Sequence, residues 1–374
     1  MGVLTGAGIQ DAVDQVELVD HHCHGVVTGE LEDDEVEALL SEGGPPAPGL
    51  TNFDTPLGLA VRRHCAPVLD LPEHPSRRDY LDRRRELGPA ELTRRFLVPT
   101  GTSRFCVDTG FRPDGLTTPE ELAAAAGARG HHVVRLESVA EALAADGVEP
   151  DEFGPRFADR LARTTAVGVK SVAAYRVGLD LDPVPPTPAE VTAAAREWLG
   201  GSSRARLDHP VLIRATLAAA VELGRPIQFH IGLGDPDIRM WRVDPTLLTD
   251  WLHRHRVPVM LLHCWPYQRQ ASYLAAVHPH VHLDVGLALH FVGPTRAAAV
   301  LAEAAELAPY GKLLYSSDAF GLPELYFLGA LTFRRALGSL LTERTAAGEW
   351  SVPDAYRIAA MVAHENATRV YELK

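Results

Sequence analysis

Short apolar runs alternate along most of the chain with longer segments whose apolar residues recur at helical spacing. We predict that eight of these runs are β-strands, at 16–20, 104–108, 132–137, 166–173, 226–230, 258–263, 280–285 and 312–317. Most of the segments between them predict amphipathic helices, for example 118–127, 138–145, 188–199, 209–223, 245–255 and 295–306. Strands that alternate with helices imply a parallel sheet, and eight such units imply an α/β fold closed into a (β/α)8 TIM barrel.

One long stretch, 26–100, departs from this alternation. After an acidic and Pro/Gly-rich first half, its apolar residues recur at helical spacing over 56–68, 77–87 and 89–97. We therefore expect a helical insertion after the first strand, within a single barrel domain that spans 1–374. Insertions at the C-terminal ends of barrel strands are where substrate pockets are shaped.

Charge and cysteine content narrow the range of partners. The formal net charge of −13 over 374 residues argues against nucleic acid or an anionic membrane as a partner. The four cysteines are scattered without a CxxC pair, which fits a reducing cytoplasm. The N-terminus lacks a signal-peptide pattern, and no apolar run approaches the ~18–20 residues needed to span a membrane. We expect a cytoplasmic homo-oligomer that acts on a small molecule.

Polar residues with metal-binding chemistry stand where several of the predicted strands end. The first strand leads into His22-Cys23-His24, and residues two apart in a strand point to the same face, so these two imidazoles can share one metal ion. Four later strands end in Lys170, His230, His263 and Asp318. The C-terminal ends of barrel strands converge on one mouth. Five strands are not expected to end this way by coincidence, so the sequence predicts a metal site at this mouth.

This order of residues resembles the amidohydrolase superfamily. In that superfamily a His-x-His ends strand one, single histidines end strands five and six, and an aspartate ends strand eight. Subtypes with two metals add a lysine at strand four, often carbamylated, which Lys170 matches. Residues 364–371 are similar to the end of the amidohydrolase-related branch that includes decarboxylases. The stretches 170–176 and 228–235 resemble the amidohydrolase-like half of proteins fused or linked to glutamine synthetase.

The roles of Lys170 and His263 stay open at this stage. Lys170 could carry a carbamate that bridges two metal ions, because a bare ammonium cannot ligate a metal. It could instead remain charged and pair with a substrate carboxylate, or be purely structural. His263 could bind a second metal, or it could polarise the scissile carbonyl and stabilise the developing oxyanion.

The candidate ligands and the residues near them suggest hydrolytic chemistry. His22, His24, His230 and Asp318, with Lys170 and His263 for a second ion, suit one or two Zn²⁺ ions, with Mn²⁺ or Fe²⁺ as alternatives. A bound water would have its pKa lowered from ~15.7 toward ~7. Asp318 could then act as general base, with His263 as a second catalytic residue. For substrate binding the sequence suggests Arg176, first choice for a carboxylate, together with Tyr175, Trp265 and Tyr267.

Three functions are compatible with these residues. The first is a metal-dependent hydrolase that cleaves a C–N bond of amide type, such as a γ-glutamyl bond, in a small carboxylate-bearing substrate through a metal-activated water. The second is a metal-dependent decarboxylase or other lyase on the same scaffold. The third is a non-catalytic scaffold or sensor of nitrogen metabolism, which the complete set of expected ligands disfavours.

Overall fold

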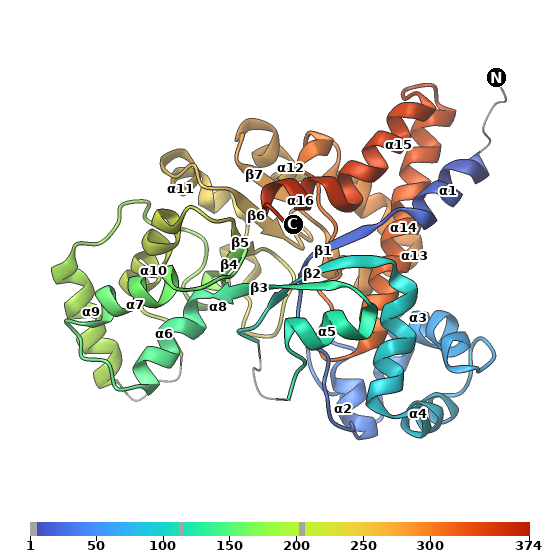
Figure 1. The fold of residues 1–374 in the computed structure, drawn as a ribbon, viewed down its shortest axis with the longest axis horizontal. Coiled ribbons are helices and arrows are strands. Elements are labelled where there is room, and N and C mark those ends of the chain that lie inside the picture. Colours follow the sequence, from blue (N-terminus) through green and yellow to red (C-terminus); the bar gives the residue numbers. More distant parts are fainter. Residues whose placement is uncertain (1–5, 112–114, 202–205) are drawn as a thin grey trace.

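Seven parallel strands form one curved sheet in this computed structural model, which describes residues 6–111, 115–201 and 206–374 (Figure 1). Each strand pairs with its neighbour in the sequence, in the order β1 to β7. The strands are β1 (Leu18–Cys23), β2 (Thr102–Asp108), β3 (Arg129–Arg135), β4 (Gly168–Ser171), β5 (Ile227–His230), β6 (Val259–Leu262) and β7 (Val281–Leu283). Sequential parallel order is the arrangement expected of repeated βα units.

The segment 313–318 closes this sheet without being a regular strand. The amide of Leu314 donates to the carbonyl of Leu283 in β7 at 3.0 Å, and the amide of His21 in β1 donates to the carbonyl of Tyr315 at 3.1 Å. The segment is therefore hydrogen-bonded to both edges of the seven-stranded sheet. The predicted (β/α)8 TIM barrel is confirmed, with an eighth strand that is less regular than expected.

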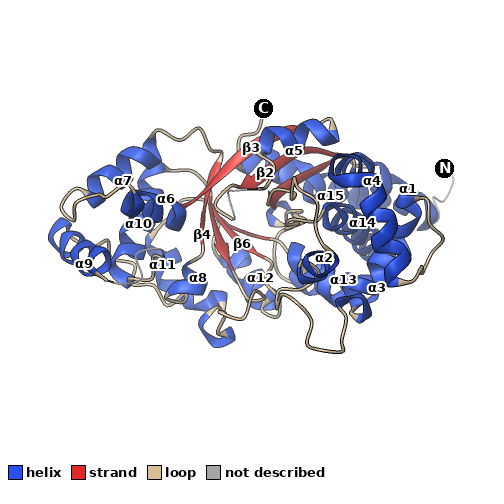
Figure 2. Ribbon diagram, turned by 90° about the horizontal axis from the view of Figure 1, so that it is seen from below, coloured by secondary structure: helices blue, strands red, loops and turns tan. Residues whose placement is uncertain are grey.

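Helices surround the strands, which lie at the centre of the molecule in Figure 2. Those that follow successive strands are α5 (Pro119–Ala126), α6 (Leu136–Ala145), α7 (Phe153–Ala162), α8 (Ala173–Arg176), α9 (Pro188–Gly200), α10 (Pro210–Leu223), α11 (Thr249–Arg254), α12 (Gln268–Val277) and α13 (Gly286–Ala304). At the two ends of the chain lie α1 (Gly6–Gln15), α14 (Pro323–Ala346), α15 (Val352–Ala360) and α16 (Asn366–Val370). Among the described residues, no helix is both long and apolar enough to cross a membrane.

Between β1 and β2 the chain forms α2 (Asp33–Ala38), α3 (Pro56–Ala60) and α4 (Arg77–Leu97). The hydroxyl of Ser76 accepts a hydrogen bond from the amide of Asp79 and so caps α4. The helix bends at Gly88, whose φ of 72° is left-handed, because Pro89 cannot continue the hydrogen-bond ladder. The two predicted helices 77–87 and 89–97 are therefore the two halves of one kinked helix.

A few boundaries differ from the predicted ones. The predicted strand 132–137 runs too far, because α6 begins at Leu136 and Glu137 lies in its first turn. The carboxylate of Glu137 accepts hydrogen bonds from the hydroxyl of Ser171 (2.8 Å) and the amide of Val172 (3.0 Å). Glu137 thus holds the end of β4 from the neighbouring helix, and it does so as a buried side chain.

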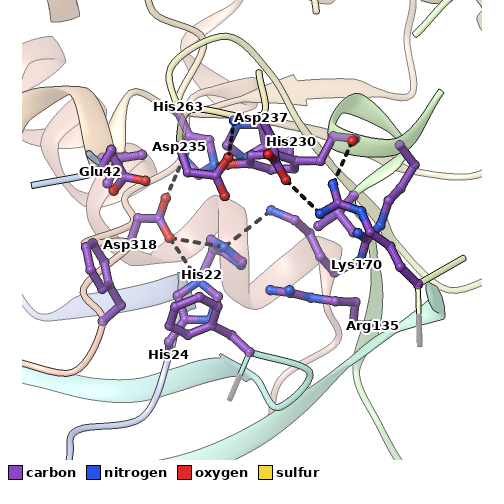
Figure 3. A pocket seen from close by; sticks show the side chains of 17 residues that line it. His22, His24, Glu42, Arg135, Lys170, His230, Asp235, Asp237, His263 and Asp318 are labelled. Atoms are coloured by element: carbon purple, nitrogen blue, oxygen red, sulfur yellow. Dashed lines mark hydrogen bonds and ion pairs between the residues drawn. The ribbon is translucent and has the colours of Figure 1, made fainter. Parts of the chain in front are cut away.

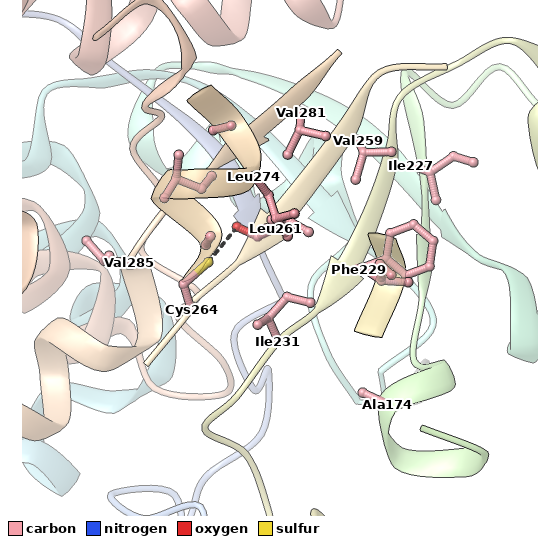
Figure 4. Close-up of a cluster of buried hydrophobic side chains, with 14 of the residues drawn as sticks. Ala174, Ile227, Phe229, Ile231, Val259, Leu261, Cys264, Leu274, Val281 and Val285 are labelled. Atoms are coloured by element: carbon pink, nitrogen blue, oxygen red, sulfur yellow. Dashed lines mark hydrogen bonds between the residues drawn. The ribbon is translucent and has the colours of Figure 1, made fainter. Parts of the chain in front are cut away.

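One face of each strand packs against the surrounding helices, and the other faces the barrel interior. Outward-facing side chains such as Ile227, Phe229 and Leu261 pack beneath the helices, together with Leu274 of α12 (Figure 4). The barrel interior holds a separate apolar cluster, which contains Val19, Cys106, Val133, Met260, Leu262, Leu314, Ala367, Tyr371 and Leu373. Residues from α16 and just after it thus fill the barrel from within. The remaining inward positions, at the C-terminal strand ends, are polar and form the site.

Candidate metal centre

The strand-end residues singled out from the sequence meet in one cavity of about 230 Å³ (Figure 3). The cavity is lined by His22, His24, Lys170, His230, His263 and Asp318, with eleven further residues. His22, Lys170 and His230 lie in β1, β4 and β5. His24 directly follows β1, His263 directly follows β6, and Asp318 lies before α14. His263 (φ 64°) and Asp318 (φ 49°) both have left-handed backbones, a conformation that is strained for most residues and that concentrates at functional sites.

Asp318 is the centre of the cluster. Its Oδ1 lies 3.2 Å from His22 Nε2 and 3.4 Å from His24 Nε2. Its Oδ2 lies 2.7 Å from His263 Nδ1. One carboxylate therefore contacts three imidazoles from two different strand ends.

His230 and Lys170 complete the cluster. His230 Nδ1 lies 3.1 Å from His263 Nε2 and 3.4 Å from the hydroxyl of Tyr175. His230 Nε2 is buried and has no hydrogen-bond partner among the described residues. Lys170 Nζ lies 3.5 Å from His22 Nε2, so the amine faces the histidine edge of the cluster.

Burial and mutual charge set the protonation of the cluster. Burial, followed by the Lys170 charge, lowers the pKa of His22 to about 3, which leaves a nitrogen lone pair free at neutral pH. Burial opposes ionisation of Asp318, but the His263 ring outweighs burial and holds the pKa of Asp318 well below its usual range. Burial also lowers the pKa of Lys170 to about 8, against a partial opposing effect of Asp318. A neutral imidazole and a carboxylate are the forms that bind metal.

These residues fit a divalent metal ion. The ligand atoms of His22, His263 and Asp318 all lie within 4.8 Å of one another, as do those of His22, His24 and Asp108. The unpartnered His230 Nε2 is a further buried donor at the same place. Imidazole nitrogen with carboxylate oxygen is the donor set of catalytic zinc sites. The sequence-predicted ligands are thus brought together, and Asp108, which was not among them, joins the cluster.

Asp108, at the end of β2, accepts hydrogen bonds from the side chain of Arg135 and from the backbone of Gly110. Its Oδ2 accepts hydrogen bonds from Arg135 Nε (3.1 Å) and Nη2 (2.6 Å), and its Oδ1 accepts one from the amide of Gly110 (2.9 Å). Burial would raise the pKa of Asp108, but the Arg135 guanidinium outweighs burial and keeps it far below its usual value. Arg135 is a lining residue that sequence reasoning missed, because a strand-end arginine has no metal-binding signature.

The four predicted substrate-binding residues separate into two pairs. Tyr175 and Arg176 line the cavity, and Arg176 Nη2 lies 3.3 Å from Glu141, which offsets part of its charge. Trp265 and Tyr267 do not line it. The chain turns through left-handed residues just after β6, Trp265 packs against the core under the helices, and the Tyr267 hydroxyl donates to the Met240 carbonyl at 2.7 Å. Among the residues that the structure describes, no contact supports the role expected for this second pair.

Glu42 and Asp235 also line the cavity. The sequence suggested the loop 232–235 after His230 as part of the mouth, but it did not suggest Glu42. Glu42 comes from the loop after α2, within the stretch 26–100, and Asp235 from the loop after β5. Figure 3 shows Glu42 on the side of Asp318, away from Lys170 and Arg135. No sequence signal marks Glu42, because its position depends on how the stretch folds back over the barrel mouth.

Comparison with known proteins agrees with this geometry. Residues 98–373 match the family described as Amidohydrolase. Protein fluG of Emericella nidulans is 33% identical over 237 residues, which are 59% of this chain and 27% of that protein, so this chain matches about a quarter of that relative's length.

Two solved structures are similar over nearly the whole chain. The first is from Lactobacillus casei ATCC 334, from a protein proposed to be a metal-dependent hydrolase. It is 29% identical, with a TM-score of 0.84 over 97% of both chains. The second is a uronate isomerase from Thermotoga maritima, 12% identical, with a TM-score of 0.65 over 98% of this chain and 97% of that one, which shows a shared fold alone. Because the family match covers most of the chain, this protein belongs to the amidohydrolase family.

Proposed function

We propose that this protein is a metal-dependent hydrolase that cleaves a C–N bond of amide type in a small substrate carrying a carboxylate. The observation that carries the proposal is the contact of Asp318 with His22, His24 and His263 at the barrel mouth. Family membership supports hydrolytic chemistry at this position. One or two Zn²⁺ ions are the proposed cofactor, and His22, His24, His230 and Asp318 would hold the first. Where two ions bind, His263 and a carbamate on Lys170 would hold the second; where one binds, these two side chains are free to act on the substrate.

The residues of the cluster can divide the work of hydrolysis. A divalent ion bound here would act as a Lewis acid and would lower the pKa of water, so that hydroxide is available to attack at neutral pH. Asp318 stays ionised, so its carboxylate can take the proton of the attacking water and deliver it to the leaving amine. His263, between Asp318 and His230, is placed to stabilise negative charge on the carbonyl oxygen. Burial of these side chains strengthens each electrostatic interaction.

The charges of the cavity support a zwitterionic substrate. Arg176 and Arg206 supply positive charge, as does Lys170 when it carries no carbamate, and Glu42 and Asp235 place two carboxyl groups away from Lys170. No described residue hydrogen-bonds or ion-pairs with the Glu42 carboxylate. Burial, then the charges of Asp318 and Asp235, raise its pKa to about 8. Glu42 is therefore mostly protonated at pH 7. A substrate ammonium beside it would lower this pKa and stabilise the charged carboxylate. An amide that carries both a carboxylate and an ammonium, such as a γ-glutamyl amide, meets both requirements.

A matched pair of substrates tests this proposal. The zinc-loaded protein should release the amine from a γ-glutamyl amide, and less efficiently from the corresponding glutaryl amide, which lacks the ammonium. Glu42→Gln should raise KM about tenfold for the first substrate, an effect of ~1.4 kcal/mol on binding, and leave the second unchanged. Amine release and carbon dioxide release are both measured.

Two results would contradict the proposal. If Glu42→Gln changes KM equally for both amides, Glu42 does not bind the substrate ammonium. Carbon dioxide release from carboxylic acids without cleavage of any amide would replace the hydrolase by the decarboxylase alternative.

A further inference from the structure

Behind the metal ligands, buried side chains form a continuous hydrogen-bond chain from His22 to Asp284. Its members are Gln228 of β5, Tyr371 after α16, His21 of β1 and Asp284 after β7. Their residues are 0%, 3%, 0% and 2% exposed, respectively. We propose that Gln228 and Tyr371 are positioning residues, which fix the ring tautomer of His22 so that Nε2 presents its lone pair to the metal. This inference rests on the metal site of the proposed function and is independent of the substrate.

The orientation of the Gln228 amide follows from its neighbours. One polar atom of this amide lies 2.8 Å from the backbone carbonyl oxygen of His21, and that oxygen can only accept a hydrogen bond. The amide nitrogen must therefore face it, and the same nitrogen lies 2.8 Å from the Tyr371 hydroxyl. Oε1 is left 2.9 Å from His22 Nδ1, where it can only accept. His22 consequently carries its hydrogen on Nδ1, and Nε2 is free.

The same reasoning continues through Tyr371. Its hydroxyl accepts from Gln228 and therefore donates to His21 Nδ1 at 3.1 Å. His21 then carries its hydrogen on Nε2, which donates to Asp284 Oδ2 at 2.9 Å. A hydrogen on His21 Nδ1 would leave the Tyr371 hydroxyl with no acceptor in the chain. The neighbouring histidines 21 and 22 thus hold opposite tautomers, and every donor in the chain has an acceptor.

The hydrogen-bond chain ends at the backbone amides of His263, just after β6, and Gly286. Asp284 Oδ1 accepts from the amide of His263 at 3.0 Å and from the amide of Gly286 at 2.8 Å. Burial would raise the pKa of Asp284, but the hydrogen bond from His21 outweighs burial and lowers it to about 2. One anionic residue therefore anchors both the chain behind His22 and the left-handed turn that carries His263.

The barrel makes room for this arrangement at Gly168. A Cβ added at this first residue of β4 would lie 3.0 Å from Cε1 of Tyr371. Glycine at this position lets the phenol ring extend through the barrel interior to reach Gln228. The segment 364–371, which resembles the end of the amidohydrolase-related branch, thus ends in Tyr371, whose hydroxyl contacts the amide that binds His22.

Zinc affinity of the purified protein tests the proposal directly. Gln228→Leu removes the acceptor of His22 and should weaken zinc binding by about 10- to 100-fold, the range typical of losing the partner of a metal-bound histidine. Tyr371→Phe removes one hydroxyl and should weaken binding about tenfold. Gln228→Glu keeps an acceptor opposite His22 Nδ1 and should restore most of the affinity lost in Gln228→Leu. The dissociation constant is measured by competition with a chromophoric chelator.

Tyr315→Phe is the matched control. Tyr315 is equally buried and packs against Phe333 outside the hydrogen-bond chain, so this variant should bind zinc like the unchanged protein. Thermal unfolding without metal shows whether each variant folds. If Gln228→Leu folds and binds zinc as tightly as the unchanged protein, or if the two Tyr→Phe variants weaken binding alike, the proposal is wrong.

Nitrogen-15 NMR of histidine-labelled, metal-free protein gives a readout that a purely structural role would not move. We expect the Nδ1–H form for His22 and the Nε2–H form for His21, with mixed forms of His21 in Tyr371→Phe. The Nε2–H form of His22 in the unchanged protein would overturn the proposal. These measurements need no substrate, so failure to hydrolyse any amide would count against the proposed function alone.

Discussion

Replacing Asp318 by asparagine is expected to lower kcat/KM for amide hydrolysis by about 10³-fold. The carboxylate contacts His22, His24 and His263 and stays ionised, so it is both a candidate ligand and the candidate general base, a role worth about 10²- to 10⁴-fold. Asparagine preserves the shape of the side chain and tolerates the left-handed backbone at this position, where φ is 49°. The loss should therefore reflect charge and proton transfer instead of misfolding.

Steady-state kinetics of the zinc-loaded variant measures this effect. Asp11→Asn, on the exposed face of α1, is the control for the chemical change itself. The Asp318 variant should keep the unfolding temperature of the metal-free protein to within a few degrees. Hydrolysis within tenfold of the unchanged protein would show that Asp318 neither binds the metal in the active form nor moves the proton.

The strand ends were predictable because barrel strands follow a simple rule. Each strand is a short and mostly apolar run buried on both faces, and polar residues at its C-terminal end emerge at the mouth. His24, His230 and Asp318 obey this rule, so their convergence could be inferred without coordinates. In the structure His24 Nε2 lies 3.4 Å from Asp318 Oδ1, and His230 Nδ1 lies 3.1 Å from His263 Nε2. The eighth strand was harder to define, because 313–318 makes few regular ladder bonds.

The residues that could not be predicted depend on long-range packing. Gln228 looks like a lone polar residue in an apolar strand until Tyr371 and the His21 carbonyl are seen beside it. Glu42 reaches the cavity only because the stretch 26–100 folds back over the mouth. Trp265 was expected there from adjacency to His263, but adjacency fails where the backbone adopts left-handed angles. Sequence spacing predicts direction within a strand, not beyond its end.

The second large effect is expected at Lys170, where function and stability should oppose each other. Burial lowers the pKa of this amine from 10.5 to about 8, and its side chain is almost completely inaccessible. The folded protein at pH 7 therefore holds a buried charge that destabilises it by about 3 kcal/mol relative to a neutral side chain. Lys170→Met should stabilise the metal-free protein by up to that amount and should lower kcat/KM by at least about 10²-fold.

The pH dependence gives the sign of this effect. The destabilisation is complete below the folded pKa of about 8 and fades as the pH rises toward the unfolded value of 10.5, because the folded protein loses the proton first. Urea unfolding of metal-free protein should therefore show a larger advantage of Lys170→Met at pH 7 than at pH 10. Lys374→Met, at an exposed lysine, should change stability at neither pH. A less stable Lys170→Met protein at pH 7 would contradict the argument that this lysine is an unfavourable buried charge.

A buried lysine that destabilises the fold is expected to have a function, and the position of Lys170 suggests what that function is. Lys170 Nζ faces Nε2 of His22, on the metal side of the cavity. An amine with a pKa near 8 is neutral often enough to react with carbon dioxide, giving a carbamate and a proton. If the carbamate bridges two ions, Lys170→Ala should bind half as much zinc and should regain activity with added formate or acetate. A raised KM with unchanged kcat and zinc content would instead assign Lys170 to the substrate carboxylate.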